Sequence, residues 1–223
     1  MPNIVPRLAL KIAGFVALAG FGRGEEIWRL DNLTAIGSHA ITMVGAPRLV
    51  QAGGQKSLRF DGASDGVFVP AIPIARAGAF TIEVLFSPDE GGLEAQRFFH
   101  LQDTRGWRAL LEIRTDQRGH WWLDTFIGTG SMTASQGVTL ADPKHAHPTG
   151  RWYWVALRYS GKTMASFVDA EMELEQPATF PPFADGSISL GVRQNLVSWF
   201  KGTIREVRFH REAIAPEKMQ RLK

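Results

Sequence analysis

Short runs of alternating apolar and polar residues, separated by turn-forming residues at regular spacing, recur through the chain from residue 31 onward. In the last run, over 202–209, Val207 and Phe209 alternate with charged residues, and a one-turn helix signal follows at Pro216. A two-residue period puts successive side chains on opposite faces of a strand. Many short strands without a long helical period predict an all-β chain.

The alternating runs and the turns between them predict an antiparallel arrangement of many strands. The turns contain Asp-Gly, Ser-Gly-Lys and Asp-Ala sequences, which favour tight connections. We therefore expect an all-β fold, a two-sheet antiparallel jelly-roll sandwich with a short C-terminal helical turn. A long Gly-, Ser- and Thr-rich segment over 128–150 is either a functional loop or a strand broken by turns. The expected strands are 57–60, 66–69, 80–86, 97–102, 107–114, 120–127, 152–159, 163–168, 172–175, 187–191 and 202–209.

Composition excludes several classes of site. The chain of 223 residues has no cysteine, so disulfides, thiolate metal sites and cysteine nucleophiles are excluded. The formal charge is +3, but Arg7 and Lys11 lie in the N-terminal segment and leave 23 basic against 22 acidic residues. Because no basic stripe remains, we expect no nucleic-acid partner.

The first 24 residues differ from the rest of the chain. Two basic residues precede the apolar run 12–18, and Ala17-Leu18-Ala19 has the small-residue pattern of a cleavage site. The segment 1–24 is thus predicted to be a signal peptide, or else an N-terminal anchor that would associate the protein with a membrane. A run that ends by Arg23 is shorter than the roughly 20 residues of a membrane span. We expect an exported, periplasmic or extracellular protein with one domain over 25–223.

Four segments in order resemble a known family. They are 57–70, 80–88, 150–169 and the C-terminal strand with its helical turn, with sequences such as Leu58-Arg59-Phe60-Asp61-Gly62 and Gly150-Arg151-Trp152-Tyr153. Together they resemble laminin-G-like, concanavalin-A-like lectin/glucanase jelly-roll domains over most of 49–219. The resemblance implies the sandwich fold, but this architecture includes lectins, adhesion domains, glycoside hydrolases and lyases.

The resemblance also implies a possible calcium site, because some relatives hold this ion near the sandwich edge. Asp61, Asp65 and Glu206 are the candidate ligands, since calcium needs several oxygen atoms together. The alternative is that Asp61-Gly62 forms a turn, Asp65 caps a loop and Glu206 pairs with an arginine. No other cofactor is expected.

Adjacent tryptophans in the strand 120–127 give the main functional lead. Trp121 and Trp122 point to opposite faces, so only one of them can lie in the core. A flat indole beside polar groups suits stacking on a sugar, whereas the alternative is packing against a crossing loop. The candidate ligand-binding residues are Trp122, His120, Asp124, Trp107, Trp199 and Arg193.

The glutamates of the run 171–175 are the only carboxylates with a catalytic pattern. A hydrolase needs two carboxyl groups facing each other across a cleft, with a raised pKa on one. The run follows a turn, so we expect a solvated hairpin arm with Met172 and Leu174 facing inward. The sequence thus favours a non-catalytic module of the cell envelope that recognises glycan. The alternatives are a structural subunit docking on an envelope protein or membrane complex, and a glycoside hydrolase.

Overall fold

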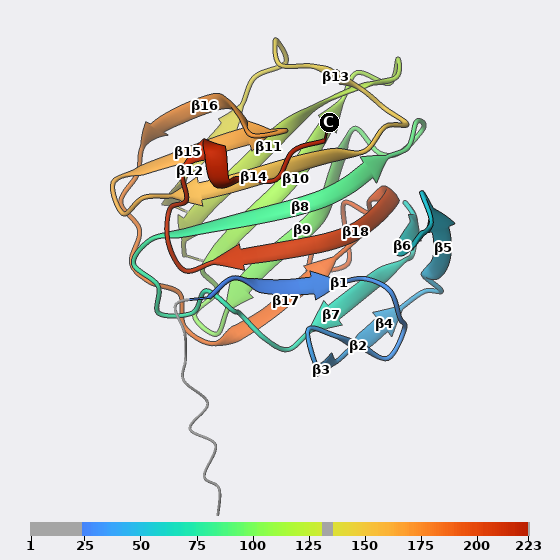
Figure 1. Ribbon diagram of the computed structural model, residues 1–223, viewed down its shortest axis with the longest axis horizontal. Helices are drawn as coiled ribbons and strands as arrows, with labels where there is room; N and C mark the ends of the chain where they lie inside the picture. The colour runs from blue at the N-terminus through green and yellow to red at the C-terminus, as the bar shows by residue number, and fades with distance from the viewer. Residues whose placement is uncertain (1–23, 131–135, 223) are drawn as a thin grey trace, which may run out of the picture.

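The computed structural model describes residues 24–130 and 136–222 as two large antiparallel sheets packed face to face (Figure 1). The elements are Glu26–Arg29 (β1), Ala35–Ile36 (β2), His39–Ala40 (β3), Thr42–Val44 (β4), Arg48–Ala52 (β5), Gln55–Asp61 (β6), Gly66–Val69 (β7), Phe80–Pro88 (β8), Ala95–Asp103 (β9), Arg108–Thr115 (β10), His120–Thr129 (β11), Gln136–Ala141 (β12), His147–Pro148 (β13), Tyr153–Tyr159 (β14), Thr163–Val168 (β15), Glu171–Pro177 (β16), Gly186–Leu190 (β17), Lys201–His210 (β18) and the 3₁₀ turn Pro216–Lys218 (η1).

Each large sheet has eight strands. The front sheet in Figure 1 has the order β16-β15-β14-β8-β18-β6-β5, with β1 also paired to β18. The back sheet has the order β12-β11-β10-β9-β17-β7-β4, with β13 also paired to β11. Every pairing is antiparallel, and many neighbours are far apart in sequence. The predicted all-β antiparallel sandwich with one C-terminal helical turn is confirmed.

Aromatic side chains fill the space between the sheets. Phe86 of the front sheet stacks on Phe98 of the back sheet with ring centroids 4.4 Å apart, and Trp121 meets Phe86 edge-on at 5.1 Å. All three side chains are fully buried. Burying a large aromatic side chain contributes about 2 to 3 kcal/mol, so this cluster holds the two sheets together.

The strands predicted from alternation are all present, to within two residues at their ends. The segment 128–150 contains β12 and β13, so the interpretation as a strand broken by turns is correct. One inward assignment was wrong: Met172 of β16 is 53% exposed. A register shift in the β15–β16 pairing, between Ser166 and Phe167, changes which side chains of this edge strand face out.

A loop over 191–200 leaves β17 and crosses the outer face of the back sheet before β18 begins. Gly191 starts it with a φ of 80°, and a side-chain carbon there would lie 2.1 Å from the Phe60 ring. Only glycine fits both the left-handed backbone and the close approach. The Arg97 N–H donates to the Ser198 carbonyl at 2.9 Å and fastens the loop to β9.

The predicted signal peptide or anchor over 1–24 lies outside the described residues except for Gly24. Within the described part of the chain, the structure has no helix that is long and apolar enough to cross a membrane.

A candidate ligand site on the outer face of the back sheet

Two neighbouring strands carry charged residues on the outer face of the back sheet. In β10, Ala109, Leu111 and Ile113 point into the core, so the residues between them point outward. The antiparallel register sets Glu112 of β10 opposite Asp124 of β11. Opposed side chains lie about 5 Å apart at their β-carbons. The sandwich therefore places two carboxyl groups side by side on this face.

These side chains line a cavity of about 230 Å³. Its walls come from three adjacent strands, from the edge strand β12 and from the loop 191–200. The volume is slightly below the roughly 300 Å³ at which small-molecule sites begin, and suits one sugar ring or an end group. The lining residues are Arg97, Arg108, Leu110, Glu112, Arg114, Asp124, Phe126, Thr139 and Arg193.

Two arginines neutralise the two carboxyl groups. Arg97 Nε lies 2.7 Å from Glu112 Oε1, and Arg114 Nε donates to Asp124 Oδ2 at 2.7 Å. Arg114 Nη2 also lies 3.9 Å from Glu112 Oε2. The Arg97 contact is an ion pair without hydrogen-bond geometry, because its Nε has no hydrogen-bond partner in the described residues. The Asp124 pairing is therefore the better-formed of the two.

Glu112 is the titratable group of this cavity. Its residue is only 2% exposed, and burial raises the pKa of its carboxyl to about 7. Asp124 raises this pKa further, whereas Arg97 and Arg114 oppose the change. A buried carboxyl group beside a second carboxylate favours its neutral form. Near neutral pH, Glu112 thus exists in both protonation states.

Arg108 and Arg193 have no carboxylate partner among the described residues. Nε of each is buried without a hydrogen-bond partner, and Arg108 is only 3% exposed. Burial lowers the pKa of both guanidinium groups, and repulsion from Arg97 lowers it further. The cavity wall thus carries donors that are already desolvated and oriented.

His100 adds a neutral donor beneath the loop. Its Nδ1 accepts the Gln194 N–H at 3.1 Å, so the neutral ring carries its proton on Nε2. Burial, together with Arg193 and Arg108, holds the pKa of His100 well below its usual value. Nε2 has no hydrogen-bond partner in the described part of the chain.

The structure brings some of the predicted ligand-binding residues together. Trp121 is fully buried while Trp122 is half-buried on the outer face, opposite Arg114. Asp124 and Arg193 line the cavity. His120 lies at the exposed start of β11, where its Nδ1 is 2.9 Å from Asp116 Oδ2.

The other two predicted aromatic residues lie outside the cavity wall. Trp107 packs edge-on against Phe180, and the Arg105 guanidinium stacks 3.4 Å from its ring centroid. Trp199 belongs to the loop 191–200 and lies beside Gly66 at the start of β7. Both are explained by packing, which is the alternative that the sequence left open for tryptophans near loops.

The three predicted calcium ligands do not form one group. Asp61 Oδ1 accepts the N–H groups of Ala63, Ser64 and Asp65 at 2.8 to 3.0 Å. Asp65 accepts the N–H groups of Asp61 and Ala46. These carboxylates therefore hold a turn.

Glu206 lies well away from that turn. In the register of β18, Asp61 pairs with Lys201, and Glu206 is five residues further along. At about 3.3 Å per residue this is roughly 17 Å. Glu206 instead accepts from Arg208 Nε at 2.6 Å, so an arginine partner accounts for it.

Sequence reasoning missed most of the cavity wall, including Arg97, Arg108, Glu112 and Arg114, and it also missed His100 beneath the loop. One signal was available: in the run Arg108-Ala-Leu-Leu-Glu112-Ile-Arg114, charged residues recur at even spacing on the face opposite the core. Such a face in a central strand is expected to be covered, and a covered charge needs a partner or a ligand.

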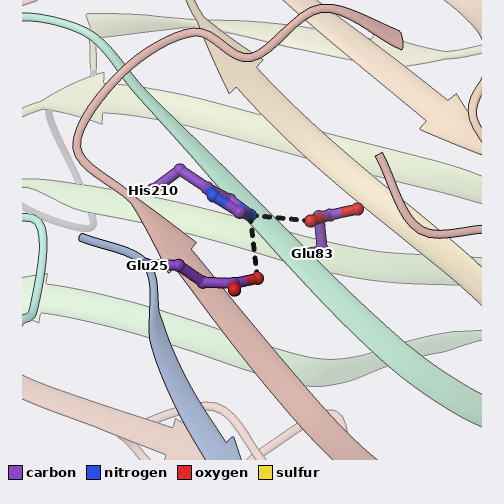
Figure 2. A group of neighbouring side chains, drawn as sticks. All are labelled: Glu25, Glu83 and His210. Carbon is purple, nitrogen blue, oxygen red and sulfur yellow. Dashed lines mark hydrogen bonds and ion pairs between the residues drawn. The ribbon is translucent and has the colours of Figure 1, made fainter. Parts of the chain in front are cut away.

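A second cluster of titratable groups lies on the front sheet. Figure 2 shows His210 Nε2 between two carboxylates, 2.7 Å from Glu83 Oε2 and 3.7 Å from Glu25 Oε1. These are the groups with metal-ligand spacing among the described residues. Glu83 Oε1 also accepts the Gln220 N–H at 2.6 Å, and Glu25 accepts from Arg208. Because the ligand atoms already have partners, the cluster fastens both ends of the domain to the sheet.

Comparison with known proteins supports the fold directly. The family profile Laminin_G_3, described as the concanavalin A-like lectin/glucanases superfamily, matches residues 61–220. No curated protein sequence matches the chain.

Several solved structures are similar to the chain. One is domain 4 of AbnA, a GH43 extracellular arabinanase from Geobacillus stearothermophilus in complex with arabinotriose, with 18% identity, a TM-score of 0.62, and coverage of 86% of this chain and 94% of that one. Another is the binding domain of botulinum neurotoxin DC in complex with SialylT, with 10% identity, a TM-score of 0.61, and coverage of 86% and 49%. The chain thus spans about half the length of the neurotoxin domain. At these identities the likeness shows the fold alone.

Proposed function

The chain belongs to the Laminin_G_3 family of concanavalin A-like lectin/glucanase domains, and from this premise we propose that it is a non-catalytic module that binds carbohydrate in the back-sheet cavity. The observation that carries the proposal is a set of buried donors without a partner in the described residues: Arg108 Nε and Arg193 Nε, which belong to lining residues of the cavity, and His100 Nε2, which lies beneath the adjoining loop. Buried polar groups in folded proteins nearly always have partners, and exceptions call for an explanation. A ligand in the cavity supplies partners for the guanidinium groups of the lining residues Arg108 and Arg193.

The chemistry of the wall suits a sugar. Guanidinium and imidazole N–H groups donate to hydroxyl oxygens, and the Asp124 carboxylate accepts from hydroxyl groups. Phe126 is half-buried in the wall, and Trp122 lies four residues earlier in β11 on the same face, outside the lining residues. Their rings offer flat apolar surfaces to the C–H face of a sugar ring. Two structural relatives were solved with saccharide-type ligands, arabinotriose and SialylT, which agrees with this use of the fold.

The setting proposed for this activity is the cell envelope. It rests on the signal-like segment 1–24, which predicts export to the periplasm or the cell exterior. The partner is then an envelope glycan. A docking role on an envelope protein is the competing outcome, and it predicts a protein partner and no saccharide affinity.

A glycan array followed by calorimetric titration of the hits tests the proposal. Arg193→Gln removes a donor from the loop without removing a buried strand residue, and we expect it to weaken saccharide binding at least tenfold. Arg48→Gln is the matched control, because Arg48 is exposed on β5 at the edge of the front sheet. Equal affinities for the wild type and Arg193→Gln would contradict the proposed site.

Glycoside hydrolysis is a second candidate, and one observation favours it. Glu112 and Asp124 are opposed carboxyl groups in one cavity, and the pKa of Glu112 is raised to about 7, as a general acid requires. Against it, arginines hold both carboxyl groups, and the side chains of Glu112 and Asp124 are only 3% and 5% exposed. Release of reducing ends from a bound saccharide by the wild type, but not by Glu112→Gln, would establish the enzyme.

A further inference from the structure

The cavity wall has more positive than negative charge. Four guanidinium groups face two carboxyl groups, and protonation of Glu112 near neutral pH reduces the negative charge further. Asp124 is occupied by Arg114, and Glu112 is shared between Arg97 and Arg114. Among the described residues, no carboxylate forms an ion pair with Arg108 or Arg193, and the attraction that Glu112 exerts on them is shared with Arg97 and Arg114.

The two unpaired arginines are costly to the folded protein. Each keeps its Nε buried without a partner, and the two groups repel each other as well as Arg97. Glu112 attracts both groups and offsets part of this repulsion, but neither arginine forms an ion pair in the described residues, and a buried charge that is incompletely paired is destabilising. A fold that keeps like charges together in a cavity has the arrangement of an anion site that is complete only when its ligand is bound.

A strand and a hydrogen-bonded loop position the two arginines. Arg108 opens the central strand β10 and is 3% exposed, with its guanidinium 5.5 Å from the Phe126 ring centroid. Arg193 sits in the loop 191–200, whose backbone closes on itself through the Arg193 N–H to Val197 carbonyl bond of 3.2 Å. Gln194 then ties this loop to the Ser187 and His100 carbonyls at 2.9 and 3.4 Å. The donors are therefore held in place before a ligand arrives.

We propose that the cavity binds an acidic sugar through its carboxylate, with the guanidinium groups of Arg108 and Arg193 as the anion-recognising pair. This inference rests on the proposed carbohydrate-binding function and names the class of ligand. The planar fork of a guanidinium group matches the two oxygen atoms of a carboxylate. Leu110 and Phe126 in the same wall cover the apolar face of the ring that carries it. A sulfate ester on a sugar presents related oxygen atoms, and the experiment separates the two.

The experiment is a calorimetric titration of the full chain with paired saccharides. The probes are oligosaccharides of galacturonate, mannuronate and hyaluronan, together with sialyllactose, each beside the same molecule with its carboxyl groups reduced to alcohols. Sulfated galactose oligosaccharides form a third set. We expect at least one carboxylated probe to bind tenfold or more tightly than its reduced partner. We also expect that preference to fall to about twofold in Arg193→Gln and to persist in Arg48→Gln.

The outcomes separate this inference from the function on which it rests. Equal binding of every acidic probe and its reduced partner would overturn the anion site and leave carbohydrate binding intact. Preference for sulfated probes alone would overturn the choice of carboxylate. Binding of none of the probes would contradict both. Arg193→Lys is a second variant, which keeps the charge and loses the planar fork. We expect the logarithm of its affinity ratio, carboxylated probe over reduced partner, to be less than half of the wild-type value.

Discussion

Buried charged groups have partners on one outer face of the sandwich, and some of them lack partners on the other, among the described residues. On the front sheet, Glu83 is 1% exposed, and both of its carboxylate oxygen atoms have partners, His210 and the Gln220 N–H. The C-terminal segment that supplies Gln220 lies across this face, with Ile214 and Met219 packed on it. On the back sheet and its crossing loop, Arg108 and Arg193 line an open cavity, and the buried Nε of each has no such partner in the described residues.

This difference separates a structural role from a binding role. A charged group that the chain itself satisfies stabilises the fold, whereas one that the chain desolvates and leaves unpaired lowers its stability. The charged contacts of the front face therefore stabilise the domain, whereas the donors at the back-sheet cavity stay available for a ligand. The predictions below test that contrast.

The largest stability effect is expected on the front face. Glu83→Ala leaves His210 and the Gln220 N–H without their acceptor, and removing one member of a buried pair costs about 3 to 5 kcal/mol. Chemical denaturation measures the loss. Glu212→Ala, an exposed change in the same segment, is the control and should alter stability by less than about 0.5 kcal/mol. A loss below about 1 kcal/mol for Glu83→Ala would show that this pair does not fasten the domain.

On the back face, stability is expected to depend on pH through Glu112. Its ordinary pKa of 4.5 is raised to about 7 in the folded protein, so between these values the folded state binds more protons than the unfolded state. Stability therefore falls as pH rises through this window, by about 3 kcal/mol in total. Denaturation of wild type and Glu112→Gln at pH 5 and pH 8 measures it, because the variant lacks the titration. Parallel pH profiles would contradict the raised pKa.

A smaller effect is expected at the turn between β6 and β7. Burial opposes the change, but hydrogen bonds from Ser64, Ala63 and Asp65 lower the pKa of Asp61 to about 2. Asp61→Ala removes these acceptors, and we expect a loss of about 1 to 2 kcal/mol. Since the carboxylate oxygens are taken by N–H and O–H donors, calcium and a chelator should each leave the melting temperature within about 1 °C. A calcium-dependent rise that Asp61→Ala abolishes would instead support an ion at this turn.

The smallest effect is expected at Trp122, which lies on the same face as the cavity but outside its lining residues. Trp122 is half-buried two residues before Asp124 on the outer face of β11, and its loss removes one stacking surface, worth about 1 kcal/mol. We expect Trp122→Ala to weaken saccharide affinity about fivefold without changing the denaturation midpoint by more than a small amount. Trp107→Ala is the comparison, since Trp107 lies away from the cavity. The saccharide affinity of this variant should match that of the wild type. Affinity that falls for Trp107→Ala and not for Trp122→Ala would move the site to the loop end.

Local sequence patterns predicted the strands and part of the outer face of the back sheet. The two-residue period in β11 separated buried Trp121 from half-buried Trp122 and placed Asp124 on the outer side. The cavity was not predictable in the same way, because Arg108 and Arg193 meet only through the strand order β10-β9-β17.

A register irregularity also hid the Arg97–Glu112 pair. The β9–β10 pairing shifts between Leu111 and Glu112, so that Glu112 faces Arg97 while Leu111 faces Phe99. Simple alternation cannot foresee a shift that depends on the packing of two strands. The site thus depends on contacts that are distant in sequence.

The most direct test of the account is to map a bound saccharide on the isotopically labelled protein by nuclear magnetic resonance. The central claim is that the donors of the back sheet and of the loop 191–200 that lack partners in the described residues form the binding surface. It predicts that the largest shifts occur at the Arg108, Arg193 and His100 side chains and at the backbone of β10 and β11. Shifts confined to the front sheet or to the loop around Trp107, with those three side chains unchanged, would contradict it.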